Sequence, residues 1–185
     1  MMTYSAQRSF NLVDYVTIAA VAALGIAVKA IITPLAQIIT GPLFIPGGAI
    51  AGGFYMLFLV LGYAIIKKPG TAFLIALIQA LVVFIAPTPA SHGIASFITY
   101  LAPGVALELL YFIMQRTSWS LLGCFLGGML ANVTGSFAVN MVIFRLPLIP
   151  LLLSLSSAAL SGALGGWIAY SVLARLEKLK IVTKA

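Results

Sequence analysis

The chain has 185 residues, of which 63% are hydrophobic and only 7% are charged, and its mean hydropathy is +1.19. This composition leaves too little polar surface to cover a water-soluble globule, so it predicts an all-α integral membrane protein. The net charge of +7 would suit a nucleic-acid partner in a soluble protein. Here, lysines and arginines retained on the cytoplasmic side of a membrane explain the charge, and no nucleic acid is expected.

Apolar runs between glycine, proline and charged residues predict six transmembrane helices in a single membrane domain covering residues 1–185. A bilayer core about 30 Å thick needs roughly 20 apolar residues per helix, so the length allows six helices with short loops. No signal peptide is recognisable at the N-terminus, and the first run is expected to remain as a helix. The predicted spans are residues 14–36, 48–66, 70–87, 93–115, 118–144 and 147–175.

The basic residues indicate the orientation of these spans, because most lie at every second boundary between them. Cytoplasmic loops carry an excess of Lys and Arg, so both termini are predicted to be cytoplasmic. Lys29 and Arg145 are exceptions that fall toward the outer face, where they either meet a ligand or reach lipid phosphates. The residues on the predicted cytoplasmic side are Arg8, Lys67, Lys68, Arg116, Arg175, Lys178, Lys180 and Lys184.

Small residues mark two helix surfaces. On the first predicted helix, Ala19, Ala23 and Ala27 recur every four residues and form a smooth face that another helix can approach closely. Residues 161–166 on the sixth helix form a second run of small residues. Docking of a partner and packing within this chain are the two interpretations of both surfaces.

The stretch 37–48 between the first two spans begins at Gln37 and is apolar but interrupted by glycine and proline. It is too apolar for a solvated loop and too broken for a helix, so it is predicted to fold back over the protein. It then forms either a lid over an outward-facing pocket or a re-entrant packing segment.

Acidic residues are scarce, and only one lies within a predicted span. Asp14 is predicted to be a helix N-cap and Glu177 to lie in a solvated turn. Glu108 falls in the fourth span, where a carboxylate either serves function or locks neighbouring helices by hydrogen bonds.

The residues needed for catalysis are missing. Paired carboxylates, metal-spaced clusters, a nucleophile elbow and a phosphate-binding glycine loop cannot be assembled, so the chain is predicted not to be an enzyme and to hold neither a metal nor a cofactor. Cys124 is predicted to be a small packing residue. Without a Walker motif, active transport requires ATP hydrolysis in another subunit or an ion gradient.

Polar side chains gather in the predicted outer halves of the helices. Asn132, Ser136 and Asn140 share a face of the fifth helix, and Ser96 and Tyr100 share one on the fourth. They predict a polar ligand pocket, although such residues also bond helix to helix in any bundle. The cluster includes Thr88, Ser91, Thr99 and Thr134. The candidate binding residues are Lys29, Gln37, Gln79, His92, Ser96, Tyr100, Glu108, Asn132, Ser136, Asn140 and Arg145.

Three local sequences carry a family resemblance. They are Gly62-Tyr-Ala-Ile-Ile-Lys-Lys-Pro-Gly-Thr-Ala before the third helix, Gly104-Val-Ala-Leu-Glu108 in the fourth, and Gly127-Gly-Met-Leu-Ala-Asn-Val in the fifth. With six spans and an alanine-spaced first helix, they resemble the S-components of energy-coupling-factor (ECF) vitamin transporters, nearest to the thiamine/hydroxymethylpyrimidine type.

The resemblance implies an ECF S-component-like bundle in a prokaryotic plasma membrane that captures a vitamin or vitamin precursor from outside. It implies a membrane-embedded coupling subunit that docks on Ala19, Ala23 and Ala27, and two cytoplasmic ATPase subunits. These partners would topple the subunit in the membrane to deliver the ligand.

Two positions depart from the family pattern, since Ala76 stands where an acid is expected and Pro103 where a glutamine is expected. Cationic thiamine therefore loses obvious partners, and a pocket with Lys29 and Arg145 suits a neutral or carboxylate-bearing ligand. The competing hypotheses are a self-sufficient small carrier or channel with Glu108 as a proton-linked group, and a membrane scaffold subunit without a small-molecule ligand.

Overall fold

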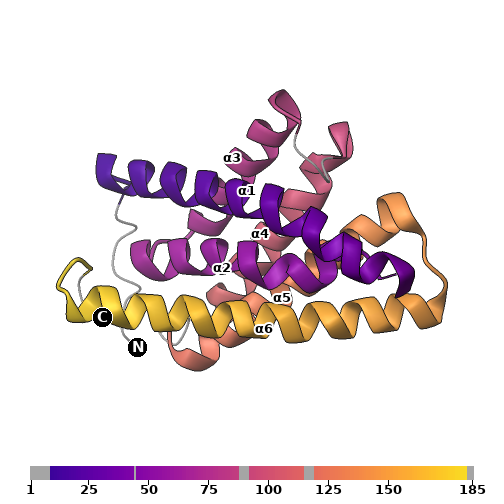
Figure 1. The fold of residues 1–185 in the computed structure, drawn as a ribbon. Coiled ribbons are helices and arrows are strands. Elements are labelled where there is room, and N and C mark those ends of the chain that lie inside the picture. The colour runs from indigo at the N-terminus through magenta and orange to yellow at the C-terminus, as the bar shows by residue number, and fades with distance from the viewer. Residues whose placement is uncertain (1–8, 44, 88–91, 115–118, 183–185) are drawn as a thin grey trace.

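The computed structural model describes residues 9–43, 45–87, 92–114 and 119–182. These residues form an all-helical bundle, which confirms the predicted fold class and the expected number of helices (Figure 1). The α-helices are α1 (Leu12–Thr40), α2 (Gly47–Ile66), α3 (Thr71–Ile85), α4 (Ser96–Met114), α5 (Leu121–Val139) and α6 (Leu148–Lys178).

Five of these helices are long and apolar enough to cross a membrane: α1, α2, α4 together with the 3-10 turn Gly93–Ala95, α5 together with the π-helical turn Asn140–Phe144, and α6. Helix α3 is apolar but has 15 residues. At 1.5 Å per residue it is about 22 Å long, shorter than a bilayer core of about 30 Å. The chain is therefore a multi-pass membrane protein, and a sixth complete span stays a prediction.

The connection between α1 and α2 corrects the expectation for residues 37–48. Helix α1 continues through Gln37 to Thr40, and the 3-10 turn Gly41–Leu43 follows before α2 begins at Gly47. The helix breakers of this stretch come only from Gly41 onward, so they end the helix and do not interrupt it. The part predicted to be too broken for a helix is thus shorter than expected.

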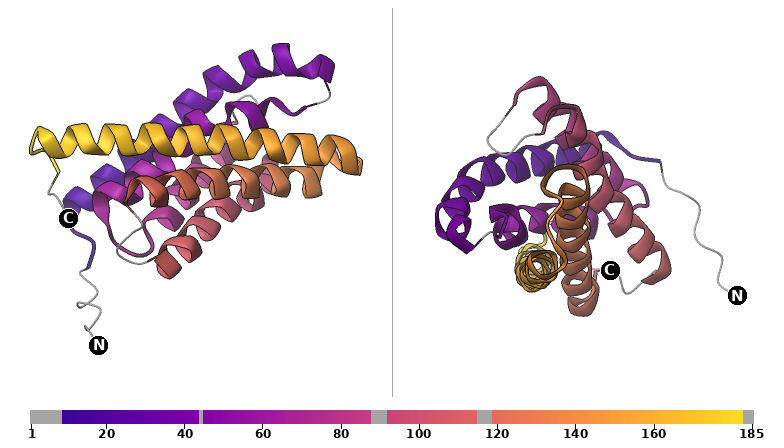
Figure 2. Two further views of the ribbon diagram at one scale, coloured as in Figure 1. Left: turned by 90° about the horizontal axis from the view of Figure 1, so that it is seen from below. Right: turned by 90° about the vertical axis from the view of Figure 1, so that its right-hand side faces the viewer.

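Helix α6 packs along α5 and α2 through glycines (Figure 2). A Cβ atom added to Gly128 of α5 would lie 2.2 Å from the carbonyl oxygen of Gly162, and one added to Gly165 would lie 2.1 Å from that of Gly53. The backbones can approach this closely only because these positions carry no side chain. The small-residue run 161–166 therefore serves packing within the chain.

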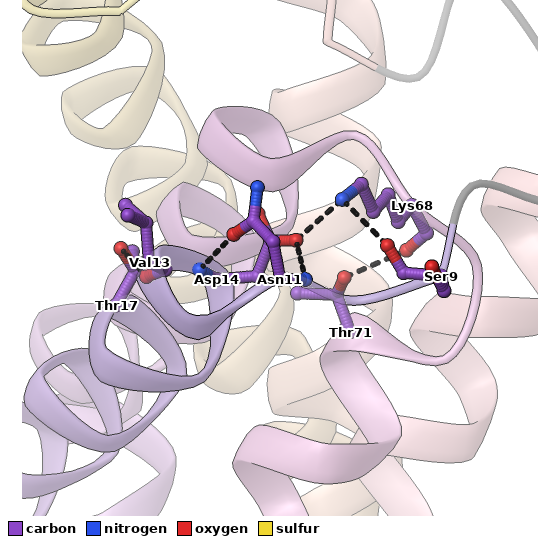
Figure 3. Close-up of polar contacts among 7 residues, drawn as sticks. All are labelled: Ser9, Asn11, Val13, Asp14, Thr17, Lys68 and Thr71. Atoms are coloured by element: carbon purple, nitrogen blue, oxygen red, sulfur yellow. Dashed lines mark hydrogen bonds and ion pairs between the residues drawn. The ribbon is translucent and has the colours of Figure 1, made fainter.

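The first turn of α1 is fixed by reciprocal hydrogen bonds that correct the prediction for Asp14 (Figure 3). Asn11 is the N-cap, and its side-chain oxygen accepts from the Asp14 amide at 2.8 Å. The Asp14 carboxylate in turn accepts from the Asn11 amide at 2.8 Å, which completes a capping box. That carboxylate also pairs with the ammonium of Lys68, which follows α2.

A second ion pair ties α6 to the same end of the bundle. Lys67 Nζ lies 3.4 Å from Glu177 Oε1, and Glu177 belongs to the last turn of α6, not to the solvated turn expected from the sequence. We call the region around these two ion pairs the basic end. The start of α1, the α2–α3 connection and the end of α6 meet there (Figure 1). Arg8, Arg116 and Lys184 lie outside the described residues.

Candidate ligand site

A cavity lies among residues from all six helices. The space between its walls, counting the part that is open to solvent, is about 790 Å³. Apolar side chains such as Met56 and Leu59 form part of its wall. The polar and titratable side chains that line it are Lys29, Thr33, Gln37, Tyr55, Gln79, His92, Thr99, Tyr100, Asn132, Ser136 and Ser154.

Lys29 of α1 brings a positive charge to this cavity. Its Nζ donates a hydrogen bond to the Tyr100 hydroxyl at 2.7 Å and lies 4.1 Å from the centre of the Tyr100 ring. The Tyr55 ring lies 5.5 Å away. The faces of aromatic rings attract cations, so the two tyrosines hold the ammonium in place without neutralising it.

Lys29, Thr33 and Gln37 form one polar row along α1. They are spaced four residues apart, which places them on the same face of the helix, and all of them line the cavity. The Thr33 hydroxyl is buried and has no hydrogen-bond partner within the described part of the chain. A buried hydroxyl without a partner is costly, so this row offers a polar group to a ligand.

His92, which precedes α4, supplies a second group of this kind. Its backbone amide donates to Ser96 Oγ at 3.0 Å, whereas its ring Nδ1 is buried and has no partner among the described residues. Burial lowers the pKa of His92, and the positive charge of Lys29 lowers this pKa further. The ring is therefore neutral at pH 7 and offers Nδ1 for hydrogen bonding.

Asn132 lines the cavity, but its side-chain amide donates hydrogen bonds to neighbouring helices. Its Nδ2 donates to the carbonyl oxygens of Ala49 in α2 at 3.0 Å and of Ala158 in α6 at 2.8 Å. A Cβ atom added to Gly52 would lie 1.7 Å from Asn132 Oδ1, so α2 approaches closely here. Asn132 thus braces α5 against two neighbouring helices beside the cavity.

Glu108, one of the predicted binding residues, is not among the residues that line the cavity. Its carboxylate accepts hydrogen bonds from the amides of Gly70 at 2.9 Å and Ala72 at 2.7 Å. Gly70 is the N-cap of α3 and Ala72 lies in its first turn. At this end of a helix, N–H groups lack partners within the helix and the helix dipole favours a negative charge. Glu108 therefore joins α4 to α3, as the helix-locking alternative predicts. Two of the segments that carry the family resemblance contact each other through it.

Three further candidates also lie outside the cavity lining. Ser96 is buried and accepts from the His92 amide, and Asn140 Oδ1 accepts from the Leu146 amide at 2.8 Å. Each of these side chains accepts a backbone hydrogen bond at the end of a helix. Arg145 is exposed, with a left-handed backbone (φ 49°) after the π-helical turn.

The cavity brings together the remaining candidates, which are Lys29, Gln37, Gln79, His92, Tyr100, Asn132 and Ser136. Thr88 and Ser91 lie outside the described residues. The sequence analysis did not name Thr33, Tyr55 or Ser154, which also line the cavity. The four-residue spacing of Thr33 from Lys29 and Gln37 was a visible signal, whereas nothing in the sequence distinguishes Tyr55 from other membrane tyrosines.

The alanines that recur every four residues on the first helix lie on the outside of the bundle. Ala19, Ala23 and Ala27 are exposed, whereas Ala22 and Gly25 of the same helix are buried. Packing within this chain is therefore not the use of this row, and it is open to another helix or to lipid.

The comparisons with known proteins agree with a membrane transport fold. A family model described as "ABC-type cobalt transport system, permease component" matches residues 13–134. The fold is similar to that of a solved structure described as "Crystal structure of an S-component of ECF transporter", with a TM-score of 0.78 and 22% sequence identity over 94% of this chain and 88% of that chain. No curated protein matches. The likeness establishes an ECF S-component-like fold.

Proposed function

Since this chain belongs to the family of ABC-type cobalt transport system permease components, we propose that it is the substrate-binding S-component of an ECF-type importer. Its ligand in this proposal is a vitamin or vitamin precursor of the thiamine/hydroxymethylpyrimidine kind. The chain itself catalyses no reaction.

The observation that carries the proposal is the cavity and its unpartnered polar groups. Folded proteins bury few polar groups without hydrogen-bond partners unless those groups have a function. Here Thr33 Oγ1 and His92 Nδ1 both line a single cavity and lack partners within the described residues. A small organic ligand with several polar atoms would supply those partners.

A cobalt ion is a poorer cargo for this cavity, although the family description names cobalt. Divalent transition metals in proteins need several imidazole, thiolate or carboxylate ligands. Within the described lining, His92 is the sole residue of these types, and it lies beside a cationic lysine. An organic ligand suits this wall better than a dication.

The proposal extends to the partners and the orientation. Both termini face the cytoplasm, as the distribution of basic residues predicts. The exposed row Ala19, Ala23 and Ala27 docks a membrane-embedded coupling subunit, which works with two cytoplasmic ATPase subunits. Their ATP hydrolysis topples the loaded subunit and moves the ligand inward.

The alternatives of a self-sufficient carrier and of a scaffold subunit have weaker support. The carrier hypothesis assigns proton coupling to Glu108, but this carboxylate binds the first turn of α3 and lies outside the described cavity lining. The scaffold hypothesis gives no role to the unpartnered groups of the cavity.

Native mass spectrometry of the chain purified in mild detergent tests the proposal, first as isolated and then after incubation with a mixture of vitamins and their precursors. We expect one small molecule per chain, and no uptake when the chain alone is reconstituted into liposomes. A protein that stays empty throughout would overturn the binding function. Uptake by the chain alone would favour the self-sufficient carrier.

A further inference from the structure

Among the described residues, no acidic side chain pairs with Lys29. The chain contains three acidic side chains, and all of them are engaged elsewhere. Asp14 pairs with Lys68, Glu177 pairs with Lys67, and Glu108 accepts from the first amides of α3. The described lining of the cavity thus includes a lysine and no carboxylate.

The immediate surroundings of Lys29 compensate for its burial only in part. The ammonium carries three N–H donors, and one of them donates to the Tyr100 hydroxyl. The rings of Tyr55 and Tyr100 attract the cation but carry no net charge. A buried charge is stabilised most by an opposite charge with good hydrogen-bond geometry.

The unpartnered groups lie beside this charge. Thr33 is one helical turn along α1 from Lys29, and the His92 ring is close enough for the charge of Lys29 to affect its pKa. A hydroxyl and a neutral imidazole can both donate hydrogen bonds to an anionic oxygen. Together with the ammonium they form a group of donors of the kind that binds an acid group.

We infer that the ligand carries an acid group, a carboxylate or a phosphate, which pairs with Lys29 inside the cavity. This inference rests on the proposed function and narrows its substrate class to organic acids and zwitterions. A permanent cation without an acid group would place a second positive charge beside Lys29, so we expect it to bind less tightly than a ligand that carries an acid group.

Isothermal titration calorimetry with matched probes tests the inference. One pair is hydroxymethylpyrimidine and its monophosphate, and the other is nicotinamide and nicotinate. Within each pair the members differ chiefly by the acid group. We expect the wild-type chain to bind an acid member about tenfold to a hundredfold more tightly than its neutral partner, because hydrogen bonds to charged groups contribute that much. The pair that shows this preference distinguishes phosphate from carboxylate.

Substitutions assign the preference to Lys29. Lys29→Met should abolish it, and Lys29→Arg should retain most of it because the charge is kept. Arg145→Gln is the matched control, since it removes a cation that lies outside the described cavity lining, and it should leave the preference unchanged. In the ligand-free state, Lys29→Met should be at least as stable to heat as the wild type, because it removes a buried charge without an acidic partner.

Several results would overturn the inference while leaving the proposed function intact. They are equal affinity for both members of each pair in the wild type, a preference that survives Lys29→Met, or a co-purified molecule without an acid group. The comparison of probes on the wild type remains decisive even if Lys29→Met does not fold. A chain that binds neither a probe nor a co-purified molecule contradicts the proposed function itself.

Discussion

The lysines of the basic end pair with acidic side chains, whereas the lysine of the cavity does not. At the basic end, Lys67 and Lys68 each meet a carboxylate, and nearby Glu108 meets the positive first turn of α3. In the cavity, Lys29 contacts Tyr55 and Tyr100, and no described acidic side chain pairs with it. The acids of the chain thus join helices at one end of the bundle, and none of them pairs with the lysine of the cavity.

The largest effect is expected where a charge satisfies backbone amides. Glu108→Ala removes the acceptor of the Gly70 and Ala72 amides and should lower the free energy of unfolding by about 3 kcal/mol or more. Thermal unfolding in detergent measures this loss. Glu108→Gln should cost less, because an amide oxygen can still accept.

Glu177→Gln is the matched control for that prediction. It removes an acid at the basic end that pairs with Lys67 at 3.4 Å, and it should lower the free energy of unfolding by less than about 1 kcal/mol. Ligand affinity should be unchanged in the folded Glu108 and Glu177 variants. A specific loss of affinity in Glu108→Gln would show that this carboxylate does serve ligand binding.

A somewhat smaller effect on stability is expected from the brace beside the cavity. Asn132→Ala removes hydrogen bonds from α5 to Ala49 and Ala158 and should destabilise the chain by about 2 kcal/mol. The difference in affinity between acidic and neutral ligands should persist, because Lys29 is untouched. Calorimetry at a temperature where the variant is folded checks this. Loss of the acid preference alone would instead make Asn132 a ligand contact.

A still smaller loss of stability is expected from a change in the capping box at the basic end. Asp14→Asn keeps a side chain of similar shape but removes the charge that pairs with Lys68, and it weakens the acceptor for the Asn11 amide. A loss of about 1 kcal/mol is expected, in the range of single caps and partly exposed ion pairs. Added salt should narrow the difference from the wild type. A difference that is independent of salt would assign the loss to the cap alone.

The fold was largely predictable from the sequence, and the reason is physical. A chain this apolar must satisfy its backbone internally in lipid, so long apolar runs become helices whatever their neighbours. Helix ends were harder. Asn11 and Asp14 are both good N-caps, and only the reciprocal hydrogen bonds of the structure identify Asn11 as the cap.

The cavity was predictable in part, because sequence spacing shows which polar residues share a helix face but not what lies opposite. Glu108 illustrates the limit. Its partners are the backbone amides of Gly70 and Ala72, which are 38 and 36 residues away and carry no side-chain signature. For Lys29, a lysine within a predicted span suggested a ligand site; the structure places this side chain in the cavity lining, and ligand binding stays a prediction. The sequence does not show that Lys29 lacks an acidic partner, because the partners of the three acids depend on how the helices pack.

The smallest expected effect is a pH dependence that arises in the cavity, from the protonation of His92, and not at the basic end. The pKa of His92 lies below its ordinary value of 6.5, so the neutral ring persists at pH 7 and takes up a proton only as the pH falls below that value. Because the folded chain binds this proton less readily than the unfolded chain, the ligand-free protein should lose some stability as the pH drops through about 6.5. An acidic ligand should show the reverse trend, with affinity rising by at most about tenfold as a second positive charge forms beside Lys29. Titrations of the acid probes between pH 7.5 and 5.5 measure this rise, with His92→Gln as the control in which it should vanish. A fall in affinity over the same range in the wild type would mean that the ligand needs the neutral ring as a hydrogen-bond acceptor.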